Sequence, residues 1–96
     1  MNLHDYLQLP DSLSVSELRI EIRAKSDAQI RQWEHGYAGR RPGLDYQVAI
    51  ERATKGLVPV EEWGVGKWMR VADEGWPHAG GRPVWDSARI DAAEEV

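Results

Sequence analysis

The chain of 96 residues contains no cysteine, which excludes disulfide bonds, thiolate zinc sites and a cysteine nucleophile together. No segment approaches the roughly 20 consecutive apolar residues that span a bilayer. The opening segment MNLHDYLQLP also lacks the basic stretch and long apolar run of a secretory signal. We therefore expect a cytoplasmic protein that is neither secreted nor inserted in a membrane.

Groups of residues that would carry catalysis or bind a metal are not evident in the sequence. The three histidines, His4, His35 and His78, are separated by 31 and 43 residues and have no neighbouring ligand pattern. The paired acids at 61–62 and 94–95 are more typical of solvated surface charge than of catalytic carboxylates. We expect no metal site, no cofactor and no small-molecule substrate, and hence not an enzyme.

The net charge of −4 is at first sight unfavourable for nucleic-acid binding, because contacts with phosphate need cations. The negative excess, however, lies entirely in residues 57–96, where four cations face eight anions, whereas residues 1–56 carry eight of each. Within residues 19–41, six cations face three anions. The positive charge is therefore local, as a DNA-binding surface requires.

Short amphipathic helices are predicted at the start of the chain. The first helix is indicated by three apolar residues at helical spacing before Asp11, namely Leu3, Tyr6 and Leu7. Ser14 followed three residues later by Glu17 is the pattern of a capping box, which opens a second helix over about residues 15–22. Leu18 and Ile22 give this helix its apolar face.

A third helix is predicted just after Arg23-Ala24-Lys25. Ser26 can accept backbone N–H groups as an N-cap, and the negative charge of Asp27 complements the helix dipole. Ile30 and Trp33 supply the inward face, and Gly36 offers a stop. Three glycines and a proline in residues 36–43 then mark a basic loop.

The fourth helix is expected over Leu44–Lys55, with Gly56 as its left-handed C′ residue. Its apolar face is predicted to consist of four residues, Leu44, Val48, Ile50 and Ala53. The fold class is accordingly mainly α, a bundle of about four helices in residues 1–57.

Residues 58–96 form an extension rich in Trp, Gly and Pro. Leu57–Val60 is interrupted by a proline, so it fits an edge strand or an extended link. Lys67–Ala72 and Arg82–Trp85 are predicted to pair as a small hairpin, with the tryptophans providing core. The acidic stretch Ser87–Val96 fits a frayed end or a helix equally well.

The second and third helices, joined by a tight turn, match the unit in which a recognition helix enters the major groove of DNA. The residues expected to read bases are Ser26, Asp27, Gln29, Arg31, Gln32 and His35. Those expected to contact phosphates are Lys25, Tyr37, Arg40 and Arg41. An ordinary amphipathic helix with a solvated polar face has the same periodicity, so helical spacing alone does not separate the two interpretations.

The sequence resembles the YdaS/Cro-like helix-turn-helix family of phage and prophage repressors. Three segments carry the resemblance: Ser16-Glu-Leu-Arg-Ile-Glu-Ile22, Ser26-x-x-x-Ile30-x-Gln32-Trp33 and Ala49-Ile-Glu-Arg-Ala-Thr-Lys-Gly-Leu-Val58. The similarity covers about residues 1–63, and Ala49–Val58 is its most specific part. The resemblance implies a λ-repressor-like helical domain that binds operator DNA, usually as a homodimer on an inverted repeat. It places Ser26, Asp27, Arg31 and Gln32 at matching recognition-helix positions.

The chain departs from the family pattern in the turn between the second and third helices. Family members normally carry a glycine there, whereas this chain has Arg23-Ala24-Lys25 and one residue more between Ile22 and Ile30. A longer turn changes the direction of the third helix and hence its contacts. A second interpretation stays open, a protein-interaction module of antitoxin or antirepressor type that uses the acidic tail on the same helical scaffold.

Overall fold

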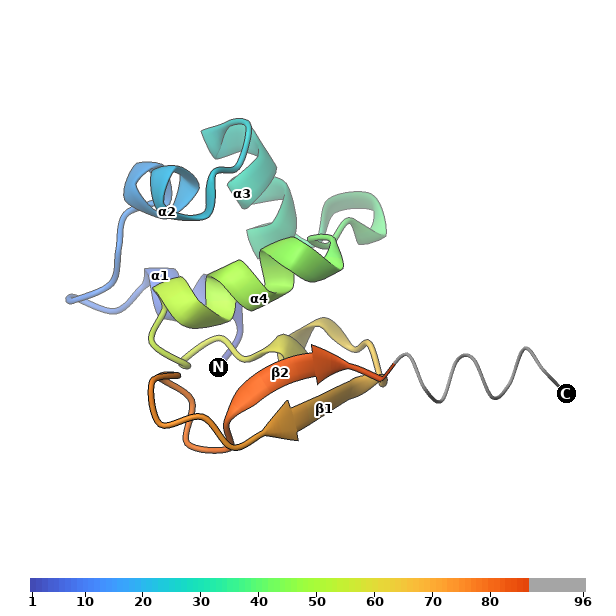
Figure 1. Cartoon of the computed structure of the whole chain (residues 1–96). Coiled ribbons are helices and arrows are strands. Elements are labelled where there is room, and N and C mark those ends of the chain that lie inside the picture. Colours follow the sequence, from blue (N-terminus) through green and yellow to red (C-terminus); the bar gives the residue numbers. More distant parts are fainter. Residues whose placement is uncertain (87–96) are drawn as a thin grey trace, which may run out of the picture.

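The computed structural model describes residues 1–86, which form four α-helices followed by a two-stranded hairpin (Figure 1). The helices are α1 (Leu3–Leu7), α2 (Val15–Ile22), α3 (Asp27–His35) and α4 (Leu44–Ala53). Single 3₁₀ turns lie at η1 (Tyr37–Gly39) and η2 (Val60–Trp63), and the strands are β1 (Trp68–Val71) and β2 (Arg82–Trp85). The prediction of a mainly helical chain is confirmed, and the predicted acidic end, Ser87–Val96, lies outside the described residues.

Helices α2 and α3 begin where their capping residues predicted. The Ser14 hydroxyl accepts the backbone N–H of Glu17 at 3.1 Å, and the Glu17 carboxylate accepts the backbone N–H of Ser14 at 2.9 Å. The Ser26 hydroxyl accepts the backbone N–H of Gln29 at 3.2 Å. Both caps satisfy N–H groups that have no partner inside the helix.

The turn between α2 and α3 contains four residues, 23–26. Its first residue, Arg23, is left-handed with φ 59°, the conformation for which glycine is usual. The N–H groups of Arg23 and Ala24 return to the carbonyls of Ile20 and Arg19, which is the Schellman pattern, and Ala24 is buried. The chain therefore makes a glycine-type turn without a glycine.

The core lies where the four helices meet. Its buried residues come from all of them and from the link after α4: Leu3, Tyr6, Leu18, Ile22, Ala24, Ile30, Trp33, Ile50 and Val58. The Trp33 ring packs against that of Tyr46, with centroids 5.1 Å apart. The apolar residues predicted for the first three helices are thus confirmed as core or as residues packed against it.

The predicted apolar face of α4 is partly wrong. Leu44 is exposed, whereas the most buried side chains besides Ile50 are polar: Gln47, Glu51 and Thr54. Their polar atoms all have partners, so burial does not leave them unsatisfied. The helix also ends at Ala53, earlier than expected, and Lys55 takes the left-handed C′ position at φ 56°, followed by Gly56 at φ 82°.

The hairpin pairs its strands as predicted. Trp68 lies opposite Trp85 and Val71 opposite Arg82 in an antiparallel register. The two tryptophan rings meet edge to face, with centroids 5.3 Å apart. The predicted edge strand over Leu57–Val60 is not present: residues 57 and 58 lie in bends, and Val60 begins η2.

An ionic network around the buried Glu51 carboxylate attaches the hairpin to α4. The Arg70 guanidinium of β1 donates to Glu51 at 2.9 Å, to Glu61 and to the Gly81 carbonyl. Glu51 also accepts from the Trp76 indole at 2.6 Å. Burial on its own would raise the pKa of Glu51, but the hydrogen bonds from Arg70, Trp76 and the Val60 backbone lower it below its usual value.

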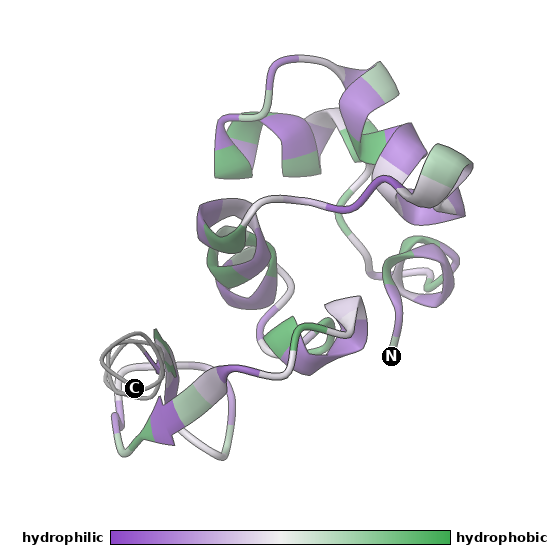
Figure 2. Cartoon of the chain, turned by 90° about the vertical axis from the view of Figure 1, so that its right-hand side faces the viewer, coloured by the Kyte–Doolittle hydropathy of each residue, from purple (hydrophilic) through white to green (hydrophobic). Residues whose placement is uncertain are grey.

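Both views of the ribbon place α2 and α3 on one side of α4 and the hairpin on the other (Figures 1 and 2). The face of α2 and α3 that points away from α4 is therefore clear of the hairpin. Within residues 1–86, none of the helices has the length and hydrophobicity needed to cross a bilayer.

Candidate nucleic-acid interface

Helix α3 is anchored by its inward face. Ile30 is fully buried and Trp33 is 7% exposed, as expected from their spacing. The residues between and beside them lie on the outside: Ala28, Arg31 and His35 are exposed, and Gln29 and Gln32 are half-buried. This polar face contains most of the residues predicted to read bases.

At the start of α3, the polar side chains bond within the protein. Ser26 caps the helix, and the Gln29 amide oxygen accepts the backbone N–H of Lys25 at 2.9 Å. Asp27 pairs with Arg19 of α2 at 3.3 Å and accepts from the Ser16 hydroxyl at 2.7 Å. These contacts hold the turn between α2 and α3 in one geometry.

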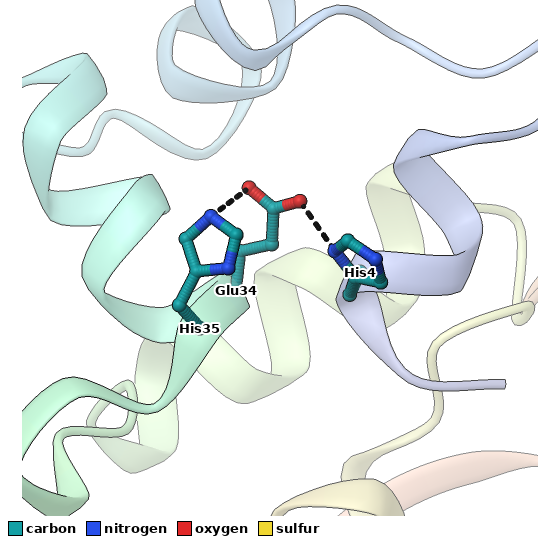
Figure 3. A group of neighbouring side chains, drawn as sticks. All are labelled: His4, Glu34 and His35. Carbon is teal, nitrogen blue, oxygen red and sulfur yellow. Dashed lines mark hydrogen bonds and ion pairs between the residues drawn. The ribbon is translucent and has the colours of Figure 1, made fainter.

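At the end of α3, the Glu34 carboxylate lies among Arg31 and two histidines, and Figure 3 shows the histidines. The Glu34 side chain is only 1% exposed, and Arg31 donates to it at 3.0 Å. His4 of α1 lies 2.9 Å from one carboxylate oxygen, and His35 lies 3.5 Å from the other. Glu34 therefore connects α1 to α3 and holds two of the predicted base-reading residues.

The environment of Glu34 has opposing effects on its pKa. Burial raises the pKa, because a charged carboxylate is less well solvated inside the protein. The hydrogen bonds from His4 and Arg31 and the charges of His35 and Arg31 outweigh burial, so the pKa lies below its usual value. Glu34 is accordingly ionised at neutral pH and balances the charge of Arg31.

Within residues 1–86, four of the predicted side chains have no hydrogen bond or ion pair: those of Lys25, Gln32, Tyr37 and Arg40. Tyr37 is 60% exposed and its ring lies 5.2 Å from that of His35. Arg41 donates one N–H to the Trp63 carbonyl at 3.1 Å. Since a guanidinium carries five donors, Arg41 keeps others for a ligand.

The internal pairs change how charge is distributed over this surface. Of the six cations in residues 19–41, Arg19 and Arg31 are balanced by Asp27 and Glu34. The other four are all exposed and stand on either side of α3: Arg23 and Lys25 in the turn before it, Arg40 and Arg41 in the loop after it. The positive charge thus flanks a polar helix at both ends.

Glu34, His4 and Arg19 were not among the residues predicted for the interface. The Arg31–Glu34 pair could have been predicted from the sequence, because residues three apart lie side by side on a helix. The contacts of His4 with Glu34 and of Arg19 with Asp27 join different helices, and no local spacing predicts them.

Comparison of the chain with the models of protein families, with curated proteins and with solved structures finds no match. The resemblance to YdaS/Cro-like repressors therefore stays a prediction, and function has to be argued from the surface itself.

Proposed function

We propose that this chain is a sequence-specific DNA-binding regulator of transcription, a Cro-like repressor, with α2, the turn and α3 as its helix-turn-helix unit. The observation that carries the proposal is the flanking of polar α3 by exposed cations at both ends. A recognition helix in the major groove has phosphates beyond each of its ends and base edges along its face. The four-residue turn falls within the length that such units use.

The intramolecular contacts divide the predicted residues into those that remain available for DNA and those that are bonded within the protein. Gln32 lies on the outer side of α3 and has no hydrogen-bond partner among residues 1–86, and glutamine can bind adenine through two hydrogen bonds. Lys25, Arg40 and Arg41 suit phosphates. Arg31 reaches a guanine only by leaving Glu34, whereas Ser26, Asp27 and Gln29 serve first to position the helix.

We also propose that two chains act together, because one such unit covers only a half-site and joining two gains avidity. The outer surface of β1 is a candidate interface, since Met69 is 49% exposed and Val71 is 42% exposed. Sedimentation at about 100 µM protein with an inverted-repeat duplex tests the proposal: a dimer supports it, and a monomer that binds without cooperativity contradicts it.

Selection from random duplex DNA, followed by sequencing, tests the proposed function. The expected result is a recovered consensus that binds at least about 10³-fold more tightly than random duplex at physiological salt. A protein-interaction module of antitoxin or antirepressor type would yield no consensus. Selection with the double variant Arg40→Ala/Gln32→Ala serves as the control and should recover a weaker consensus that is relaxed at the base pair read by Gln32.

A further inference from the structure

His4, Glu34 and His35 form a cluster whose atoms are of the types that bind zinc. Two imidazole nitrogens and one carboxylate oxygen are a known ligand set for a site that keeps one position open. In this chain the candidate ligand atoms all lie within 4.8 Å of one another. They come from α1 and from the last turn of α3, thirty residues apart, and converge on one spot (Figure 3).

The two histidine nitrogens both lie near the Glu34 carboxylate, each beside a different oxygen. Ligand atoms of one tetrahedral zinc lie about 3.4 Å apart, given bonds of about 2.0–2.1 Å. The distance from Glu34 Oε2 to His4 Nδ1 is 2.9 Å, and that from Glu34 Oε1 to His35 Nε2 is 3.5 Å. The imidazole ring centroids are 5.7 Å apart.

Burial makes Glu34 the fixed member of the cluster and the histidines the adjustable ones. The Glu34 side chain is 1% exposed, whereas those of His4 and His35 are 50% and 37% exposed. Binding of one ion would require the two rings to turn toward one carboxylate oxygen, and their exposure leaves room for that movement. The exposed side remains open to solvent, which supplies the fourth ligand.

A second group with suitable atom types is already neutralised. Glu51 and Glu61 lie near His78, but both carboxylates bind the Arg70 guanidinium. The Arg70 guanidinium therefore already supplies the positive charge between these two carboxylates. Among residues 1–86, the cation that competes in the first cluster is Arg31, which donates one N–H to the Glu34 carboxylate at 3.0 Å and is 57% exposed.

We propose that His4, Glu34 and His35 bind a divalent transition-metal ion of the zinc type, which links α1 to the end of α3. Because Arg31 shares the carboxylate with the ion and repels it, Arg31 weakens binding. The inference does not depend on DNA binding, and its test uses the protein alone.

The test is a calorimetric titration of the full chain, without a histidine tag, with ZnCl₂. One zinc should bind per chain and raise the melting temperature, because an ion that binds the folded state stabilises it. His4→Ala and His35→Ala should each weaken binding roughly tenfold or more. Arg31→Ala should strengthen binding. His78→Ala is the matched control and should leave it unchanged.

Circular dichroism verifies that each variant is folded. The His4 and His35 variants should fold because both side chains are exposed. The absence of zinc binding by the wild-type chain would overturn the proposal. So would unchanged affinity in the His4 and His35 variants, or loss of binding in His78→Ala, which would place the ion at the other group.

Discussion

The Arg70 guanidinium binds the Glu51 carboxylate, which is fully buried in the middle of the protein. Arg70 is on the hairpin and Glu51 is on the helix that supports α2 and α3. The Trp76 indole and the Val60 backbone N–H donate to the same carboxylate. Glu51 therefore links α4 to the C-terminal hairpin through polar contacts.

Removal of the Glu51 charge should be strongly destabilising. Glu51→Gln leaves the Arg70 guanidinium, 14% exposed, without its main partner, and breaking such a buried pair costs about 3–5 kcal/mol. Urea denaturation measures the free energy of unfolding. Glu74→Gln, on an exposed acid, is the control and should change stability by at most about 0.5 kcal/mol. Equal effects in the two variants would contradict the role given to Glu51.

Acid should destabilise the protein through Glu34 and Glu51. Their pKa values are lower in the folded chain than the ordinary 4.5, so the unfolded chain binds more protons just below pH 4.5. The stabilisation they give is complete above that value and is lost as the pH falls through the folded-state pKa. Urea denaturation from about pH 7 to about pH 3 follows the loss. Glu34→Gln should reduce the pH dependence, and an unchanged profile would refute the assignment.

Arg23 holds a conformation that L-residues adopt at a cost of roughly 1–2 kcal/mol. Glycine avoids that cost. It loses more backbone entropy on folding than other residues, however, and this lowers stability by about 0.5–1 kcal/mol. Arg23→Gly should therefore stabilise by about 0.5–1 kcal/mol in urea denaturation. Lys25→Gly, in the same turn and not at positive φ, should not stabilise. A less stable Arg23→Gly variant would show that the Arg23 side chain makes a stabilising contact.

The helices of this fold could be predicted because the sequence features that define them are local. Ser14, Ser26 and Gly36 mark helix ends through atoms of their own or nearby residues, and the apolar spacing identifies Ile30 and Trp33 as core. The buried polar face of α4 could not be predicted from the sequence. Gln47 and Glu51 can be buried because Trp68, Trp76 and Arg70 donate hydrogen bonds to them. These three residues lie more than 18 residues away in the sequence.

The same distinction holds for the candidate site. Sequence predicted which residue types lie outside on α3, since that follows from helical periodicity. It did not predict that Asp27 would pair with Arg19, or Glu34 with His4, across helices. Contacts between elements depend on their packing, which a single sequence does not encode locally.

Gln32 should read a base. Gln32→Ala should weaken binding to the selected operator by about 1–3 kcal/mol and leave binding to random duplex unchanged, because a lost base contact removes specificity first. Fluorescence anisotropy with labelled duplexes measures both affinities. Gln8→Ala, an exposed glutamine at the end of α1, is the matched control and should change neither. A parallel loss on both DNAs would make Gln32 a backbone contact.

The dependence of DNA affinity on salt tests the central claim most directly. Each phosphate contact contributes about −0.9 to the slope of log K against log salt concentration, so Lys25, Arg40 and Arg41 predict about −3 per chain on mixed duplex DNA. Arg40→Ala should make the slope shallower by about one unit. A slope near zero, or one that Arg40→Ala leaves unchanged, would contradict a DNA-binding surface around α3.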